Sequence, residues 1–96
     1  MADQSYQVVN NVKKFRFEVV NGSQISKLDY RLGRDTIALV HTEVPEELSG
    51  QGIGSTLVSA ALQHARDNEL TVLPYCPFVA AYVARHPEWE DIVGEI

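Results

Sequence analysis

The centre of the chain carries a glycine-rich stretch that separates two hydrophobic periods: Val44-Pro45-Glu46-Glu47-Leu48-Ser49-Gly50-Gln51-Gly52-Ile53-Gly54-Ser55. Upstream of it, apolar side chains recur at every second residue, which is typical of strands with one buried face. Downstream they recur at every fourth residue, which indicates an amphipathic helix. The stretch is therefore predicted to be a loop that leaves a strand and opens a helix.

Three alternating runs precede the loop and are predicted to be strands. The first begins at Phe15, the second spans residues 26–32 with Leu28, Tyr30 and Leu32 on its buried face, and the third spans residues 36–44. Tight turns rich in Gly, Asn and Asp separate the runs. Consecutive strands joined in this way form an antiparallel meander.

The segments after the loop complete an α/β pattern. A helix is predicted over residues 52–68, a strand parallel to the third over residues 70–73, and a short helix over residues 78–85 that Pro77 opens. The expected fold class is α/β, with a mixed sheet in which an antiparallel β-β-β meander is followed by α-β-α. Residues 1–96 suit a single domain, in which residues 1–12 are either flexible or an added edge segment.

Composition excludes several classes of function. The chain has 96 residues, one cysteine and a formal net charge of −5, which argues against a nucleic-acid partner because phosphate neutralisation needs clustered cations. The single Cys76 excludes an intramolecular disulfide and cysteine-rich zinc sites, so no metal is expected. No apolar run reaches the roughly 18 residues that cross a bilayer. We therefore expect no membrane partner and a cytoplasmic protein.

The glycine loop has the composition of an anion site. Glycines allow an anion to approach the backbone closely, and the first amides of a helix have no intrahelical partner and lie at the positive end of the macrodipole. These features together form a phosphate cradle. The loop lacks the Gly-Lys-Ser/Thr of a P-loop and the G-x-G-x-x-G of dinucleotide folds. A tight turn without a ligand remains the alternative.

The same stretch resembles the cofactor motif of the GNAT N-acetyltransferases, [Q/R]-x-x-G-x-[G/A]. Gly52 and Gly54 match its two small positions, whereas Ser49 stands where the family usually has Gln or Arg. The chain is also similar to a small single-domain branch of that superfamily over roughly residues 15–93. The motifs of that branch read here His41-Thr42-Glu43-Val44-Pro45, Pro74-Tyr75-Cys76-Pro77-Phe78-Val79 and His86-Pro87-Glu88-Trp89.

The resemblance implies a minimal GNAT-like fold that uses acetyl-CoA as cosubstrate. It places the cofactor in the splay between the third and fourth strands, with the pantetheine pairing with backbone around Glu43 and Val44 as an added strand would. It places the pyrophosphate on the loop amides. The implied cofactor-binding residues are Val44, Gln51, Gly52, Ile53, Gly54 and Ser55.

Three side chains are candidates for the chemistry of acetyl transfer, which needs a base for the amine and an acid for the departing thiolate. His41 and Glu43 are two residues apart, so they are predicted to share a strand face above Ile37 and Leu39 and to act as a proton-accepting pair. The alternative is that Glu43 pairs with a surface cation and that His41 is a hydrogen-bonded residue at the boundary of the core. Cys76 is a candidate acid or nucleophile, or a packing residue.

Two further side chains lie on the predicted helices. Larger family members use a tyrosine on the last helix as the acid, and Tyr82 is on that helix about one residue out of register. His64 is predicted to be a solvated side chain.

Two functions stay open from the sequence. The first is an acetyl-CoA-dependent N-acetyltransferase that moves an acetyl group directly to an amine acceptor, either a small molecule or a protein lysine. The second is a sensor or interaction module that binds CoA or acetyl-CoA with little catalysis. A structural domain without cofactor is disfavoured by the loop and its flanking motifs. The chain is expected to be a monomer or a weak homodimer.

Overall fold

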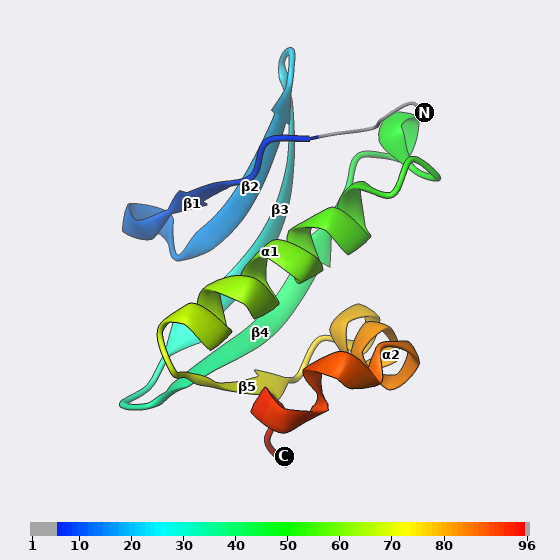
Figure 1. The fold of residues 1–96 in the computed structure, drawn as a ribbon. Coiled ribbons are helices and arrows are strands. Elements are labelled where there is room, and N and C mark those ends of the chain that lie inside the picture. Colours follow the sequence, from blue (N-terminus) through cyan, green and yellow to red (C-terminus); the bar gives the residue numbers. More distant parts are fainter. Residues whose placement is uncertain (1–5, 96) are drawn as a thin grey trace.

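The protein folds as one five-stranded sheet with two α-helices (Figure 1). The computed structural model describes residues 6–95. The elements, in order, are β1 (Val9–Asn11), η1 (Val12–Lys14), β2 (Arg16–Asn21), β3 (Gln24–Leu32), β4 (Thr36–Glu43), η2 (Glu46–Leu48), α1 (Ile53–Asp67), β5 (Thr71–Pro74), α2 (Pro77–Arg85) and η3 (Pro87–Ile92).

The sheet confirms the predicted mixed α/β class. Its strands follow the order β1-β2-β3-β4-β5, with every neighbouring pair antiparallel except β4 and β5, which are parallel. A parallel pair needs a crossover, and α1 supplies it. Of residues 1–12, the first five lie outside the described residues, whereas residues 9–11 pair with β2 as an edge strand.

β1 is held to β2 by a cluster of polar side chains. Asn11 donates a hydrogen bond from Nδ2 to the Glu18 carboxylate at 3.1 Å, and Arg16 forms an ion pair with the same carboxylate. The hydrogen bond from Arg16 is the main reason why the pKa of Glu18 lies below its usual value, although burial acts in the opposite direction. Glu18 therefore stays ionised where the two strands meet.

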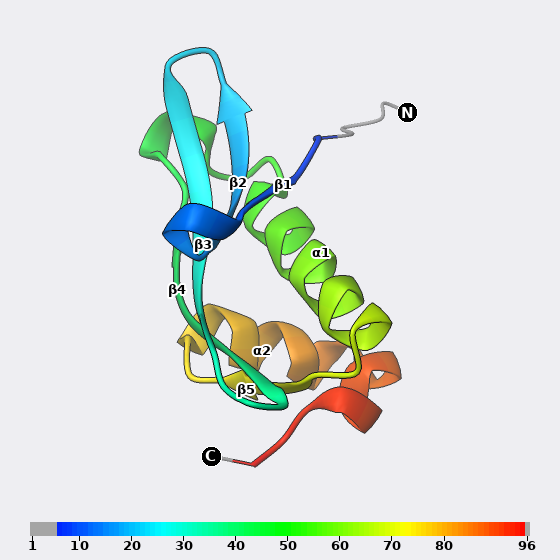
Figure 2. The same cartoon turned by 90° about the vertical axis from the view of Figure 1, so that its left-hand side faces the viewer.

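The core lies between the sheet and α1 (Figure 2). The i, i+4 stripe predicted for the helix is buried, because Leu57, Ala61 and Ala65 are fully inaccessible. They pack with Phe17 and Leu28, which point from β2 and β3 toward the helix. The apolar faces that result from alternation in the strands and from the 3.6-residue period of the helix thus pack together in one layer.

A β-bulge in β4 reverses the predicted alternation of that strand. Tyr30 pairs with Leu39, but the preceding Asp29 pairs with His41, so Val40 is an extra residue on β4. A bulge places two residues opposite one and shifts every later side chain to the other face. The prediction that His41 and Glu43 share a face with Ile37 and Leu39 is therefore wrong.

β4 and β5 separate soon after they pair. Their register runs from Thr36↔Thr71 to Leu39↔Pro74, and the Cys76 amide adds one hydrogen bond to the Leu39 carbonyl at 2.9 Å. Beyond that point the chain turns into α2, which packs against α1, β4 and β5. Within residues 6–95, the part of β4 after the bulge pairs only with β3. The bulge and the splay thus occupy the same position.

Candidate functional site

The N-terminus of α1 is open to solvent and has the backbone of an anion site. Gly50 and Gly52 both have left-handed backbone, with φ of 82° and 81°. Gly52 is the N-cap of α1 and brings no side chain to satisfy the first turn. The amides of Ile53, Gly54 and Ser55 therefore begin the helix without a capping side chain. A Cβ at Gly50 or Gly52 would meet nothing within 4 Å, so open space surrounds these two glycines.

Gly54 has a different role from the other two glycines. A Cβ at Gly54 would lie 3.0 Å from the Phe78 ring, so its absence allows α2 to approach α1. Of the three glycines expected to admit an anion, only Gly50 and Gly52 face open space. Gly54 contributes its amide, and its lack of a side chain serves helix packing.

Side chains of the loop have partners of their own. The Ser49 hydroxyl donates to the Glu46 carbonyl at 3.0 Å, which closes the turn of η2. The Tyr6 hydroxyl donates to Gln51 Oε1 at 2.8 Å, so the segment before β1 contacts the loop. The sequence gives no sign of this contact, because 45 residues separate the two partners. The backbone N–H of Gln51, rather than its side chain, is then available to an anion.

Cys76 and Thr42 face each other across the splay. The Cys76 sulfur lies 3.4 Å from the Thr42 hydroxyl, and Cys76 is 4% exposed. Burial raises the pKa of the Cys76 thiol, but hydrogen bonds from Thr42 and from the backbone of Val79 and Phe78 outweigh it, so the pKa lies below the ordinary value. Cys76 is the N-cap of α2, where the helix dipole also favours a thiolate.

His41 and Glu43 lie on the face of β4 that Thr42 does not share. Their side chains are 58% and 61% exposed, and His41 Nε2 is 3.4 Å from Glu43 Oε1. The structure brings the two residues together as predicted, although on the solvent face. Thr42 lies between His41 and Glu43 in the chain and contacts Cys76. The three candidate catalytic residues therefore surround residues 41–43 of β4, with Cys76 on one face and the side chains of His41 and Glu43 on the other.

Tyr82 and His64 both contact aromatic rings. Tyr82 is 9% exposed and stacks on His86 with ring centroids 4.1 Å apart. His64 is partly exposed and also packs edge-on against the Phe17 ring, with ring centroids 5.6 Å apart.

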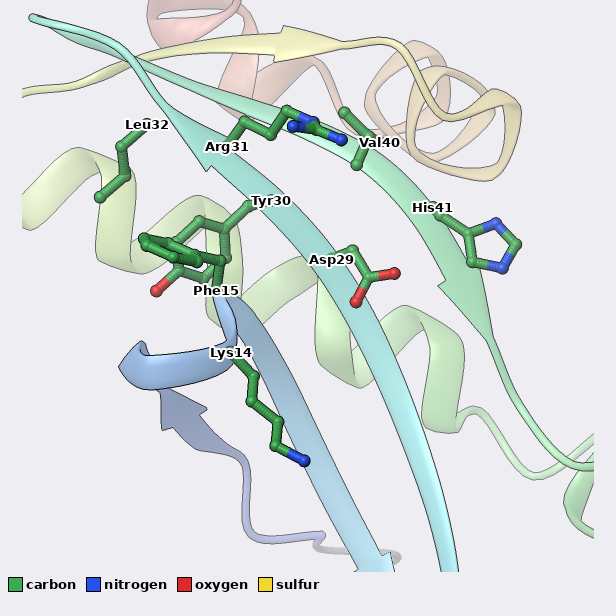
Figure 3. Close-up of a pocket in the computed structure, with 8 residues that line it drawn as sticks. All are labelled: Lys14, Phe15, Asp29, Tyr30, Arg31, Leu32, Val40 and His41. Carbon is green, nitrogen blue, oxygen red and sulfur yellow. The ribbon is translucent and has the colours of Figure 1, made fainter.

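A hollow of about 640 Å³ lies across β3, between η1 and β4 (Figure 3). It was not predicted. Leu32, which alternation placed in the core, is 51% exposed and lines this hollow, because β2 begins only at Arg16, opposite Asp29, and leaves the end of β3 uncovered. The lining residues are Lys14, Phe15, Asp29, Tyr30, Arg31, Leu32, Val40 and His41.

Two other kinds of site find no support in the described part of the chain. Residues 6–95 contain no group of three or more His, Cys, Asp or Glu that could hold a metal ion. None of the helices formed by these residues is both long and apolar enough to cross a membrane.

The comparison with known families agrees with this geometry. A sequence model of the family described as GCN5-related N-acetyl-transferase matches residues 14–92. The chain therefore belongs to the GCN5-related N-acetyltransferases, as its motifs predicted.

The chain is also similar to individual proteins and to one solved structure. Protein NATD1 of Xenopus tropicalis is 31% identical over 87 residues, which cover 86% of this chain and 79% of that protein. Protein NATD1 of Gallus gallus is 32% identical over 85 residues, which cover 84% of this chain and 76% of that protein. A GCN5-like protein from Staphylococcus aureus superimposes with a TM-score of 0.74 and 23% identity, covering 98% of this chain and 93% of that one. This last likeness establishes the fold.

Proposed function

We propose that the protein is an acetyl-CoA-dependent N-acetyltransferase that transfers the acetyl group directly to an amine. The observation that carries the proposal is the succession of two features along the chain. The strand β4 loses its pairing with β5 at the bulge, and the loop after β4 leads into the uncapped N-terminus of α1. An anion site and an open strand edge then follow one another along the chain. A ligand with a diphosphate and an amide-bearing arm matches both.

The residues present fit acetyl-CoA. The pyrophosphate would be held by the amides of residues 51–55, above the two glycines with left-handed backbone. The pantetheine amides would pair with the backbone of β4 around Val44, on the edge that β5 leaves. The thioester would then lie near the bulge, where Cys76 contacts one face of β4 and the His41 side chain projects from the other.

The chain supplies one proton acceptor and one proton donor for the transfer. The amine nitrogen bonds to the thioester carbonyl carbon as the carbon–sulfur bond breaks, which gives an amide and the CoA thiolate. His41, next to the Glu43 carboxylate at 3.4 Å, accepts the proton that the amine loses. Cys76 donates a proton to the CoA thiolate. Both groups then return to their starting states by exchange with solvent.

A second candidate function is a CoA-binding or acetyl-CoA-binding module with little turnover. The burial of Cys76, which is 4% exposed, favours it, because a buried thiol is a poor exchange partner for solvent protons. Binding with slow acetyl-CoA hydrolysis, and no transfer to any amine, would support this candidate over the enzyme.

Calorimetric titration with CoA and acetyl-CoA tests the cofactor site. We expect a Kd in the micromolar range, about −8 kcal/mol, and loss of binding in Gly52→Glu, because the added carboxylate would occupy the anion site. Gly22→Glu is the matched control: Gly22 also has positive φ and open surroundings, but it lies in the β2–β3 turn. Equal affinity in both variants would move the pyrophosphate away from the loop.

Turnover tests the roles of the side chains. Cys76→Ala is expected to bind CoA normally and to transfer acetyl groups more slowly, by roughly 10²-fold or more if Cys76 is the acid. Unchanged turnover in this variant would leave Cys76 as a packing residue.

A further inference from the structure

We infer that the hollow across β3, defined above by its eight lining residues, binds the acceptor, and that this acceptor is a small amine that also bears a carboxylate, such as an amino acid or a short peptide. The inference rests on the proposed acetyltransferase function, and it adds the substrate class. Its first support is position. Val40, the bulge residue, and His41, the proposed base, form one wall of the hollow.

The hollow therefore opens on the face of β4 where His41 takes the proton. Asp29 and His41 are directly opposite each other across β3 and β4, on the face away from the buried Leu28. Cys76 and Thr42 contact each other from the other face. An acceptor in the hollow and a thioester in the splay would thus approach the bulge from different sides, so that neither blocks the other.

The charges of the hollow favour a carboxylate. Lys14 and Arg31 line it. Among the described residues Arg31 forms no ion pair, and Lys14 forms none within 4 Å but acts electrostatically on the Glu18 carboxylate. The one acid in the wall, Asp29, already pairs with Lys27 at 3.2 Å. Arg31 thus has no anionic partner among the described residues, although the whole chain has a net charge of −5. A ligand carboxylate would accept charge-assisted hydrogen bonds from these cations.

The same wall accommodates an amine. Asp29 lies between the two cations and opposite His41, as Figure 3 shows. A zwitterionic ligand with its carboxylate at Arg31 or Lys14 would place its amine beside Asp29, within the part of the hollow next to His41. Opposite charges in neighbouring positions thus match the two ends of an amino acid.

The apolar side of the hollow accommodates the rest of such a ligand. The Phe15 ring is 51% exposed and stands edge-on to Tyr30, with centroids 6.2 Å apart. Phe15 adopts the left-handed backbone region, with φ of 55°, which is costly for a residue with a side chain. An apolar or aromatic group would cover the exposed part of the Phe15 ring.

Two matched probes test the inference: phenylalanine, and phenethylamine, which has the same body without the carboxylate. Initial rates with acetyl-CoA should give a KM for phenylalanine at least about tenfold lower than for phenethylamine. Arg31→Gln should raise the KM for phenylalanine by about tenfold and leave that for phenethylamine and both kcat values unchanged. Arg34→Gln, an exposed cation outside the hollow, is the control.

NMR shifts of backbone amides separate this inference from the proposed function. In the CoA-bound protein, phenylalanine should shift the amides of Asp29, Arg31 and His41. Equal KM values for the two probes, or CoA binding without these shifts, would overturn the carboxylate site and leave the acetyltransferase standing. Shifts without turnover would retain the carboxylate site but overturn the acceptor role. Failure of CoA itself to bind would overturn the proposed function and, with it, the acceptor role.

Discussion

The Cys76 thiol combines burial with a lowered pKa, and the two properties have different origins. Burial disfavours the thiolate, so the sulfur would titrate above its ordinary range if it were merely packed. The Thr42 hydroxyl and the first amides of α2 reverse this preference. A packing cysteine would not need donors placed on two sides. The arrangement therefore supports a chemical role, whether as acid or as nucleophile.

The pH dependence of Cys76 alkylation measures this pKa directly. Because hydrogen bonds hold the pKa below the ordinary value, the thiolate persists to lower pH, and the midpoint of the iodoacetamide rate should lie below that of a free cysteine. Thr42→Val keeps the shape but removes one donor, so its midpoint should rise. Mass spectrometry follows the reaction without ambiguity because the chain has one cysteine. A midpoint at the ordinary value would contradict the prediction.

At the residue scale, the sequence identified the glycine loop but not all of its partners. Gly50 and Gly52 were predictable as glycines of the loop and the helix start because a helix was expected to begin at residue 52. The requirement for a residue without a side chain at position 54 was not predictable, because it depends on the Phe78 ring, which α2 contributes. The Tyr6 contact with Gln51 was hidden for the same reason. Long-range contacts leave no periodic trace in a sequence.

At the element scale, the bulge in β4 is the feature that organises the site. It places Val40 and His41 together on the outer face and coincides with the loss of pairing between β4 and β5. Strands and helices were predictable because their periods differ, 2.0 against 3.6. The bulge was not predictable, because the order Leu39-Val40-His41 continues an acceptable alternation of apolar and polar residues. Only the register with β3 reveals the extra residue.

Deletion of Val40 tests whether the bulge opens the cofactor site. Leu39 would still point inward and His41 outward, so the deletion restores regular pairing without exposing the core. We expect a folded protein whose affinity for CoA falls by at least about tenfold, or about 1.4 kcal/mol, because we infer that the separation of β4 from β5 depends on the bulge.

Deletion of Ala38 is the control for this experiment. It would reverse the facing of one part of β4, turn a fully buried residue such as Ile37 or Leu39 outward, and is expected to unfold the domain. Circular dichroism and calorimetry distinguish the two variants. Full affinity for CoA in a folded Val40 deletion would show that the splay does not depend on the bulge.

At the scale of the whole molecule, the described residues form one apolar layer and a solvent face that carries charge. All the buried apolar side chains belong to a single cluster between the sheet, α1 and α2. The outer face of β3 and β4 carries Lys27, Asp29, His41 and Glu43 in ion pairs. The edge strands β1 and β5 have three and four residues, which limits edge-to-edge pairing and supports the proposal of a monomer or weak homodimer.

Such a small core makes stability responsive to ligands, because binding to the native state alone adds directly to the free energy of unfolding. At 100 times its Kd, CoA should add about 2.7 kcal/mol, and for a domain of this size the melting temperature should rise by about 10 °C or more. Thermal unfolding followed by circular dichroism, with and without CoA, measures the shift.

Two variants divide the expected shift between the anion site and the rest of the domain. Gly52→Glu should unfold at the same temperature with and without CoA, because its carboxylate repels the pyrophosphate. Gly22→Glu should be destabilised to a similar degree by its left-handed backbone but should keep the full CoA shift. If both variants keep the shift, CoA binds away from α1. If the unmodified protein shows none, CoA does not bind the native domain, and the chain must use its glycine loop as a turn alone.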